Sequence, residues 1–137
     1  MQINELGEFG VIDILKRMVV DQRADHGNAE GLSFNLTVDN GDDTAAWSAG
    51  QGQTLFTTDT MVEGIHFNKG TIPFRDVGWK AIASNLSDVA AMGGMPLYAL
   101  INLGLCPETP VNDIDELYAG FLDACIEYNL QIIGGNL

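Results

Sequence analysis

Three acidic sites stand out because each lies where a carboxylate could bind a metal ion. They are Asp42-Asp43 in a turn, Asp59 after a predicted strand, and Asp88 among Ser, Ala and Val neighbours in a predicted helix. A carboxylate in surroundings such as those of Asp88 needs a partner, because burying a lone charge is costly. Mg²⁺ takes carboxylate and hydroxyl oxygens and bridges carboxylates to phosphates. A metal-phosphate site is therefore one hypothesis for this chain.

Simpler interpretations of the same residues stay open. Adjacent acids in a glycine-containing turn, such as Asp42 and Asp43, are usually solvated turn residues. Asp59 can form an Asx-turn or a cap, and Asp88 can bond to a neighbouring backbone amide. His66 by itself is more often a partly buried histidine than a ligand contact. Residue types and spacing alone do not decide between a metal site and ordinary turn chemistry.

The composition restricts the class of partner. The chain has 137 residues, with 6 Lys+Arg against 19 Asp+Glu and a formal net charge of −13. Nucleic acids and anionic membrane surfaces both require clustered cations, so we expect neither as a partner. An acidic protein can still bind a phosphorylated ligand when divalent cations lie between the two. Neither a GxxxxGK[ST] loop nor a GxGxxG string occurs in the sequence.

The cysteines and the hydropathy favour a cytoplasmic, single-domain protein. Cys106 and Cys125 form no CxxC pair and no zinc-ligand spacing, so we expect reduced thiols in the core. No run of about 18 apolar residues is present, so we expect no membrane span. A hydrophobic content of 46% is enough to form a core.

Hydrophobic periodicity predicts the elements that must position these side chains. Helices are predicted at residues 8–22, 73–93 and 111–128. Strands are predicted at residues 32–38, 44–48, 53–58, with an extension at 61–67, 97–105 and 130–133. The alanine-rich helix at 73–93 is small and apolar nearly all round, which is typical of a helix packed on more than one side. The order predicts a mixed α/β or α+β domain with helices against a sheet.

Several strings in this sequence occur together and in order in a known family. They cover nearly the whole chain: GEF at 7–9, GDDTAA at 41–46, TTDTMVEGIHF at 57–67, GWKA at 78–81, NLSDVAAMGGMP at 85–96 and GG at 134–135. With these strings the chain resembles the N-terminal half of the thiamine-monophosphate kinase family. That family belongs to the superfamily of aminoimidazole ribonucleotide synthetase.

The resemblance implies an ATP-dependent phosphotransferase with Mg²⁺ as cofactor. Family members transfer the γ-phosphoryl of ATP to thiamine monophosphate and give thiamine pyrophosphate. Carried over by motif, the metal ligands are Asp43, Thr57 through its backbone, Thr58, Asp59, Asp88 and Asn136, the thiamine-phosphate contact is His66, and the ATP contacts are Gly135 and Asn136. Phosphoryl transfer depends on positioning and charge neutralisation, which agrees with the acidic composition if Mg²⁺ shields the phosphates.

The resemblance also implies the architecture. We expect a small mixed sheet of about four strands with helices on one face, as in the N-terminal domain of the aminoimidazole ribonucleotide synthetase-like fold. In the family this sheet pairs with its twin, so we expect a homodimer. The apolar run at 97–105 and the alternating strand at 32–38 would suit a sheet that needs a partner.

The chain departs from the family at two points. Family members carry a second α/β domain, so residues 1–137 correspond to the N-terminal ATP/Mg-binding and dimerisation domain, and we expect the isolated chain to be inactive. The family motif Gly-Gly-Asp is replaced by Gly134-Gly135-Asn136. An Asn offers a carbonyl oxygen without a charge, which puts one implied metal site in doubt.

Two alternatives stay open at this point. The first is a related kinase or synthetase of the superfamily that acts on another small substrate, against which the string at 64–67 argues. The second is a dimerisation or metal-binding module without catalysis, which Asn136 supports. A magnesium-dependent nucleotide-binding titration separates the enzyme from the non-enzyme interpretation.

Overall fold

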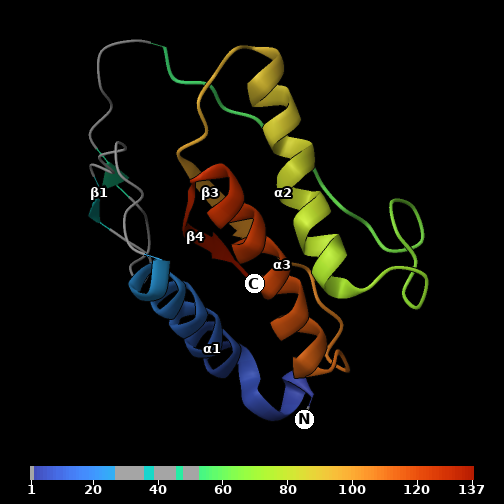
Figure 1. Ribbon diagram of the computed structural model, residues 1–137. Coiled ribbons are helices and arrows are strands. Elements are labelled where there is room, and N and C mark those ends of the chain that lie inside the picture. Colours follow the sequence, from blue (N-terminus) through green and yellow to red (C-terminus); the bar gives the residue numbers. More distant parts are fainter. Residues whose placement is uncertain (1, 27–35, 39–45, 48–52) are drawn as a thin grey trace.

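The computed structural model of the chain describes residues 2–26, 36–38, 46–47 and 53–137. Within these ranges the helices are α1 (Ile3–His26), α2 (Phe74–Ala91) and α3 (Val111–Tyr128), and the strands are β1 (Leu36–Val38), β2 (Ala46–Trp47), β3 (Tyr98–Asn102) and β4 (Gln131–Asn136). The domain is therefore of the mixed α/β class, as the sequence predicted. Figure 1 shows α3 lying between α1 and α2.

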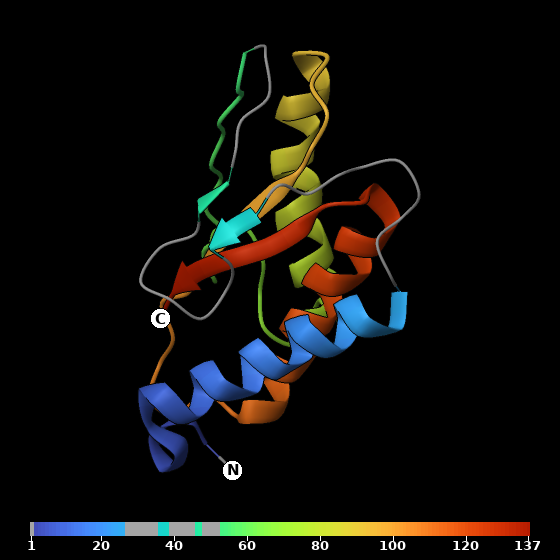
Figure 2. The ribbon, with the colours of Figure 1, turned by 90° about the vertical axis from the view of Figure 1, so that its left-hand side faces the viewer.

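Strands β3 and β4 form a parallel pair that α3 connects. Tyr98 lies opposite Gln131 and Asn102 lies opposite Asn136, with a shift in register after Ala99. Parallel neighbours need a crossover connection, and the helix between these strands supplies it. Figure 2 looks onto this pair, with α2 and α3 behind it. The carboxyl ends of both strands consequently lie at the same edge.

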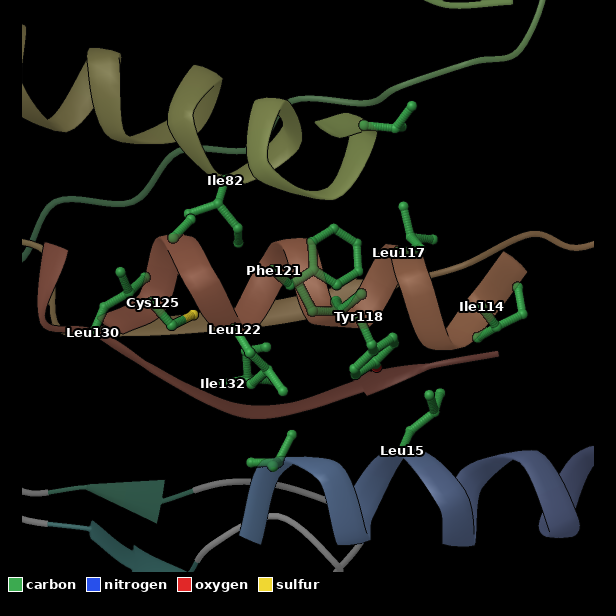
Figure 3. Close-up of a cluster of buried hydrophobic side chains, with 14 of the residues drawn as sticks. Leu15, Ile82, Ile114, Leu117, Tyr118, Phe121, Leu122, Cys125, Leu130 and Ile132 are labelled. Atoms are coloured by element: carbon green, nitrogen blue, oxygen red, sulfur yellow. The ribbon is translucent and has the colours of Figure 1, made fainter. Parts of the chain in front are cut away.

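Helix α3 is the centre of the hydrophobic core (Figure 3). Its buried residues recur with helical spacing and include Ile114, Leu117, Phe121 and Cys125. Side chains from every neighbouring element pack around it: Val11, Leu15 and Val19 from α1, Val77 and Ile82 from α2, Ile101 from β3 and Ile132 from β4. The amphipathic pattern of residues 111–128 therefore predicted both the helix and its buried side.

Two glycines allow the backbones of α2 and α3 to pack directly against each other. A Cβ at Gly78 would lie 2.1 Å from the carbonyl oxygen of Leu117, and a Cβ at Gly120 would lie 1.9 Å from that of Arg75. The neighbouring Arg75 Nε donates a hydrogen bond to Asp123 Oδ2 across the same interface, at 2.6 Å. Alpha-helix 2 is thus fixed against the core along its amino-terminal half.

The expectation of one sheet of about four strands is wrong within the described residues. Strand β1 pairs antiparallel with β2, β3 pairs with β4, and the two pairs form separate sheets. The predicted strand at 53–58 is also wrong, because residues 53–60 are not in a strand. The parts of the predicted strands at 32–35, 44–45 and 48 lie outside the described residues.

The helices differ from the predictions in smaller ways. Alpha-helix 1 begins before residue 8 and is interrupted by a kink at Gly7, whose φ of 68° and ψ of 170° are not helical. Within the described residues, the fully buried residues of α2 are Val77, Gly78 and Ile82, so its closest packing is against the core. Cys125 is buried as expected, whereas Cys106 is exposed. In the described ranges, the helices are too short or too polar to cross a membrane.

Candidate functional site

The segment at 53–60, which precedes α2, contacts the helix near Asp88 and brings Asp59 to the same place. Thr57 Oγ1 donates a hydrogen bond to Asp88 Oδ2 at 3.0 Å, and the backbone N–H of Asp59 donates to Asn85 Oδ1 at 2.8 Å. Asn85 and Asp88 are three residues apart on α2, so they lie on the same side of the helix. Figure 1 shows this segment in green, running to α2. Asp59, on the segment, and Asp88, on the helix, consequently lie beside the hydrogen bonds that join the segment to α2.

Asn85 is a residue of this site that the sequence analysis did not single out. Its Nδ2 donates to the carbonyl oxygen of Ala81 at 2.9 Å while its Oδ1 accepts from Asp59. The side chain is half-buried. The sequence did contain a signal for Asn85, because it is a polar amide in an alanine-rich helix, three residues before Asp88. Helix propensity gives no reason for an asparagine at that position.

The carboxylates of Asp59 and Asp88 are both exposed. Thr58, between Thr57 and Asp59, is exposed too, so hydroxyl and carboxylate oxygens are accessible at one place. The described residues contain no group of three or more His, Cys, Asp or Glu side chains placed to hold a metal ion. Mg²⁺ is usually held by only one or two carboxylates together with water and substrate phosphates. The oxygen donors present here therefore fit Mg²⁺ that is brought with a phosphorylated ligand.

A shallow hollow adjoins Asp88. It has a volume of about 290 Å³ and is lined by Leu55, Phe56, Thr57, Asp88, Val89 and Met92. The apolar side chains make up most of the wall, with Thr57 and Asp88 as its polar members. Small-molecule sites commonly combine an apolar wall with a few polar groups.

His66 lies in a separate turn that is attached to the same helix. Its side chain is exposed, so the partly buried histidine is not what the structure shows. Nδ1 of His66 accepts a hydrogen bond from the Val62 backbone N–H at 3.0 Å, which places the proton of the neutral ring on Nε2. Lys80 Nζ donates to the carbonyl oxygen of His66 at 3.1 Å. Lys80 is a second residue that the sequence analysis did not single out.

Further contacts hold the chain between this turn and α2. The rings of Phe67 and Phe74 meet edge to face with centroids 6.3 Å apart. Lys69 Nζ lies 3.0 Å from Asp113 Oδ2 on α3 and 5.6 Å from the centroid of Phe74. The loop that carries His66 is therefore connected to both α2 and α3.

Gly135 and Asn136 lie at the carboxyl end of β4, and both are exposed. A Cβ at Gly135 would lie 1.7 Å from the carbonyl oxygen of Ile101, so close strand pairing requires a glycine here. The carbonyl oxygen of Asn136 accepts from the Leu103 N–H at 2.9 Å. The structure gives Gly135 a packing role, and its predicted ATP contact stays a prediction. Asp43, the first predicted metal ligand, lies outside the described residues.

Comparison with protein families gives a match over most of the chain. Residues 41–137 match the family described as AIR synthase related protein, N-terminal domain. This range contains every residue that the motifs assign to metal, ATP or substrate.

Two curated relatives are thiamine-monophosphate kinases. The enzyme of Aquifex aeolicus (strain VF5) is 39% identical over 137 residues, which are 100% of this chain and 39% of that protein. The enzyme of Synechococcus elongatus (strain ATCC 33912 / PCC 7942 / FACHB-805) is 35% identical over 137 residues, covering 98% of this chain and 37% of that protein. The chain thus spans less than half of the length of these relatives.

Solved structures of the same kind resemble this fold. The crystal structure of thiamine-monophosphate kinase from Stenotrophomonas maltophilia K279a gives a TM-score of 0.69 at 31% identity, covering 95% of this chain and 37% of that chain. The structure of AaThiL complexed with AMPPCP and TMP gives a TM-score of 0.57 at 34% identity, covering 99% of this chain and 38% of that chain.

Proposed function

Because the chain belongs to the AIR synthase related protein family, we propose that it is the ATP- and Mg²⁺-binding part of a kinase acting on thiamine monophosphate. The reaction is transfer of the γ-phosphoryl of ATP to thiamine monophosphate, which gives thiamine pyrophosphate. One observation carries the proposal: the hydrogen bonds from Thr57 and Asp59 to α2 bring Asp59 and Asp88 to one exposed place. Support also comes from the relative that was solved with AMPPCP and TMP.

The groups that would hold Mg²⁺ are the carboxylates of Asp59 and Asp88, the hydroxyl of Thr58 and the backbone carbonyl of Thr57. When bound, Mg²⁺ neutralises part of the phosphate charge, which is the main electrostatic need in phosphoryl transfer. Thr57 orients the Asp88 carboxylate by its hydrogen bond. Asp43 and Asn136 complete the proposed metal set by motif alone. The net charge of −13 makes a metal-free complex with ATP unfavourable.

His66 and Gly135 are the proposed contacts to the two substrates. The neutral His66 ring presents Nε2–H as a donor, because its Nδ1 is already occupied by the Val62 N–H. A phosphate oxygen of thiamine monophosphate can accept that hydrogen bond. Gly135, without a side chain, leaves the backbone at the end of β4 accessible to a phosphate of ATP.

We also propose that the chain forms a homodimer and lies in the cytoplasm, where ATP is found. Large apolar side chains are exposed, among them Phe56 at 78%, Met92 at 73%, Met95 at 71% and Leu100 at 57%. Exposed apolar surface of this kind is typical of an interface. Light scattering at micromolar concentration should give twice the chain mass of 14.8 kDa. A mass of one chain across that range would contradict the dimer.

A calorimetric titration with AMPPCP tests the proposed function. The chain should bind AMPPCP in the presence of MgCl₂ and lose that binding when EDTA removes the metal. Binding that does not depend on magnesium, or no binding at all, would contradict the proposal and favour a non-catalytic dimerisation module. We expect no useful phosphorylation of thiamine monophosphate by this chain alone, because it spans less than half of the length of these relatives and phosphoryl transfer depends on many positioning groups.

A further inference from the structure

The segment that carries Asp59 lacks the usual means of holding an extended backbone. Residues 53–60 are not in a strand, so no ladder of backbone hydrogen bonds fixes them. In their place, two hydrogen bonds from this segment end on α2, at Asn85 and at Asp88. Asp88 belongs to the proposed metal site, and a ligand that binds metal cannot be the segment's independent anchor. Asn85 is the anchor that no metal or substrate role explains.

Asn85 is itself fixed in orientation. Its Nδ2 donates to the carbonyl oxygen of Ala81 at 2.9 Å, so its Oδ1 points toward the Asp59 N–H, which it meets at 2.8 Å. An amide held at both ends cannot rotate to accept elsewhere without losing one of these bonds. The bond from Asn85 to Ala81 is partly buried, so less water competes for it than for the exposed bond from Asp59.

We propose that Asn85 is a positioning residue for the metal site, which rests on the proposed function of that site. It fixes the backbone of Asp59 at Asn85, which lies roughly 4.5 Å along the helix axis from Asp88, and thereby limits the separation of the two carboxylates. Removing a partner that orients a metal ligand typically lowers metal affinity about 10- to 100-fold. Without Asn85 the Asp59 carboxylate explores more positions, and the metal meets fewer preformed ligands.

The experiment compares the chain with two variants. Asn85→Ala removes both hydrogen bonds and places a strong helix former in α2, so the helix should be kept. Asn112→Ala makes the same change at an exposed position of α3 and is the matched control. Asn85→Asp keeps an acceptor oxygen for the Asp59 N–H but loses the donor to Ala81.

Amide hydrogen exchange at Asp59 in the metal-free chain measures the attachment itself. Exchange should be about tenfold faster in Asn85→Ala, unchanged in Asn112→Ala, and slower in Asn85→Asp than in Asn85→Ala. The magnesium concentration for half-maximal AMPPCP binding, measured by calorimetry, should rise about tenfold in Asn85→Ala. The same concentration should not change in Asn112→Ala. A merely structural side chain would change thermal stability without changing this magnesium requirement.

The outcomes separate the two proposals. An unchanged Asp59 exchange rate in Asn85→Ala overturns the positioning role, and so does faster exchange with an unchanged magnesium requirement. If the parent chain binds no AMPPCP at any magnesium concentration, the proposed function fails, while hydrogen exchange still tests whether Asn85 holds the backbone of Asp59. In that case the Asp59 exchange rates still distinguish a lost function from a lost attachment.

Discussion

Helix α2 presents two sides that are held in different ways. Toward α3 it packs through Gly78 and Ile82, and added atoms at Gly78 would meet backbone at 2.1 Å. Toward the segment at 53–60 it is joined by side-chain hydrogen bonds at Asn85 and Asp88, and Asp88 is exposed. On the first side, close steric packing fixes the helix against α3. On the second side, a few polar contacts position a neighbouring segment.

The difference teaches how the chain can keep its fold while its site adjusts. Overpacking a close interface typically costs 1–3 kcal/mol, because neither backbone can move aside easily. A typical hydrogen bond contributes about 1 kcal/mol, and less where water competes. Changes on the α3 side should therefore reduce the free energy of unfolding, whereas changes on the other side should mainly alter ligand binding.

The largest effect is expected from Gly120→Ala. The new methyl group would lie 1.9 Å from the Arg75 carbonyl oxygen, so α2 and α3 must separate. The free energy of unfolding, measured with urea, should fall by about 3 kcal/mol. Gly104→Ala is the control, because nothing lies within 4 Å of a Cβ there. Equal stability of the two variants would show that the close approach is not required.

The helices were predictable from the sequence because their pattern is local. The predicted range 111–128 matches α3, and the predicted 73–93 contains α2 with a small excess at each end. Each has an apolar stripe of helical period. The division of the described strands into two separate sheets was not predictable in this way, because strand pairing depends on partners distant in sequence. The segment at 53–58 has strand-like residues, but Thr57 and the following Asp59 donate hydrogen bonds to side chains of α2.

The site was predictable only in part. The motifs identified Thr57, Asp59 and Asp88, and the structure brings these three together. Asn85 and Lys80 act through hydrogen bonds to backbone groups of other segments, which no spacing rule reveals. The hydrogen bonds show proximity and not metal binding. The predicted metal, ATP or substrate roles stay predictions for every site residue: Asp43, Thr57, Thr58, Asp59, His66, Asp88, Gly135 and Asn136.

The next largest effect is expected from Asp88→Asn, on the polar side of α2. The side chain keeps its volume and loses its charge, so the fold should be kept while Mg²⁺ loses a ligand. The dissociation constant for AMPPCP at fixed magnesium should rise about 100-fold, roughly 2.8 kcal/mol. Asp76→Asn removes an exposed charge from the first turn of the same helix and should leave binding nearly unchanged. Similar losses in both variants would indicate a general charge effect.

A smaller effect is expected from Lys80→Met, which removes the donor to the His66 carbonyl and keeps the length of the side chain. The turn should loosen, because one of the contacts that join it to α2 is lost. The amide protons of Gly64 and His66, which bond to Phe67 and Val62, should exchange about fivefold faster. Lys16→Met on α1 controls for the loss of charge. An unchanged turn would show that Phe67 and Lys69 suffice to hold it.

The smallest effect is expected from Asn136→Asp, which restores the charged residue of the family motif. Asn136 is an exposed strand residue at the end of β4, beside Asn102. A carboxylate gives Mg²⁺ a full negative charge, whereas the amide gives only a carbonyl dipole. Carbonyl oxygens also bind hard cations, so the present residue should weaken the site without removing it. The magnesium concentration for half-maximal AMPPCP binding should fall a few-fold in the variant.

The competing interpretation is that Asn136 is present for its tolerance of unusual backbone angles. In the described part of the chain, the non-glycine residue with a positive φ is Asn129, at the carboxyl end of α3, and not Asn136. The backbone therefore gives no reason for an asparagine at 136, and the ligand interpretation gains weight. Asn112→Asp adds the same charge on α3 and controls for a general increase in acidity. Superimposable magnesium titrations of parent and Asn136→Asp would show that this side chain does not reach the metal.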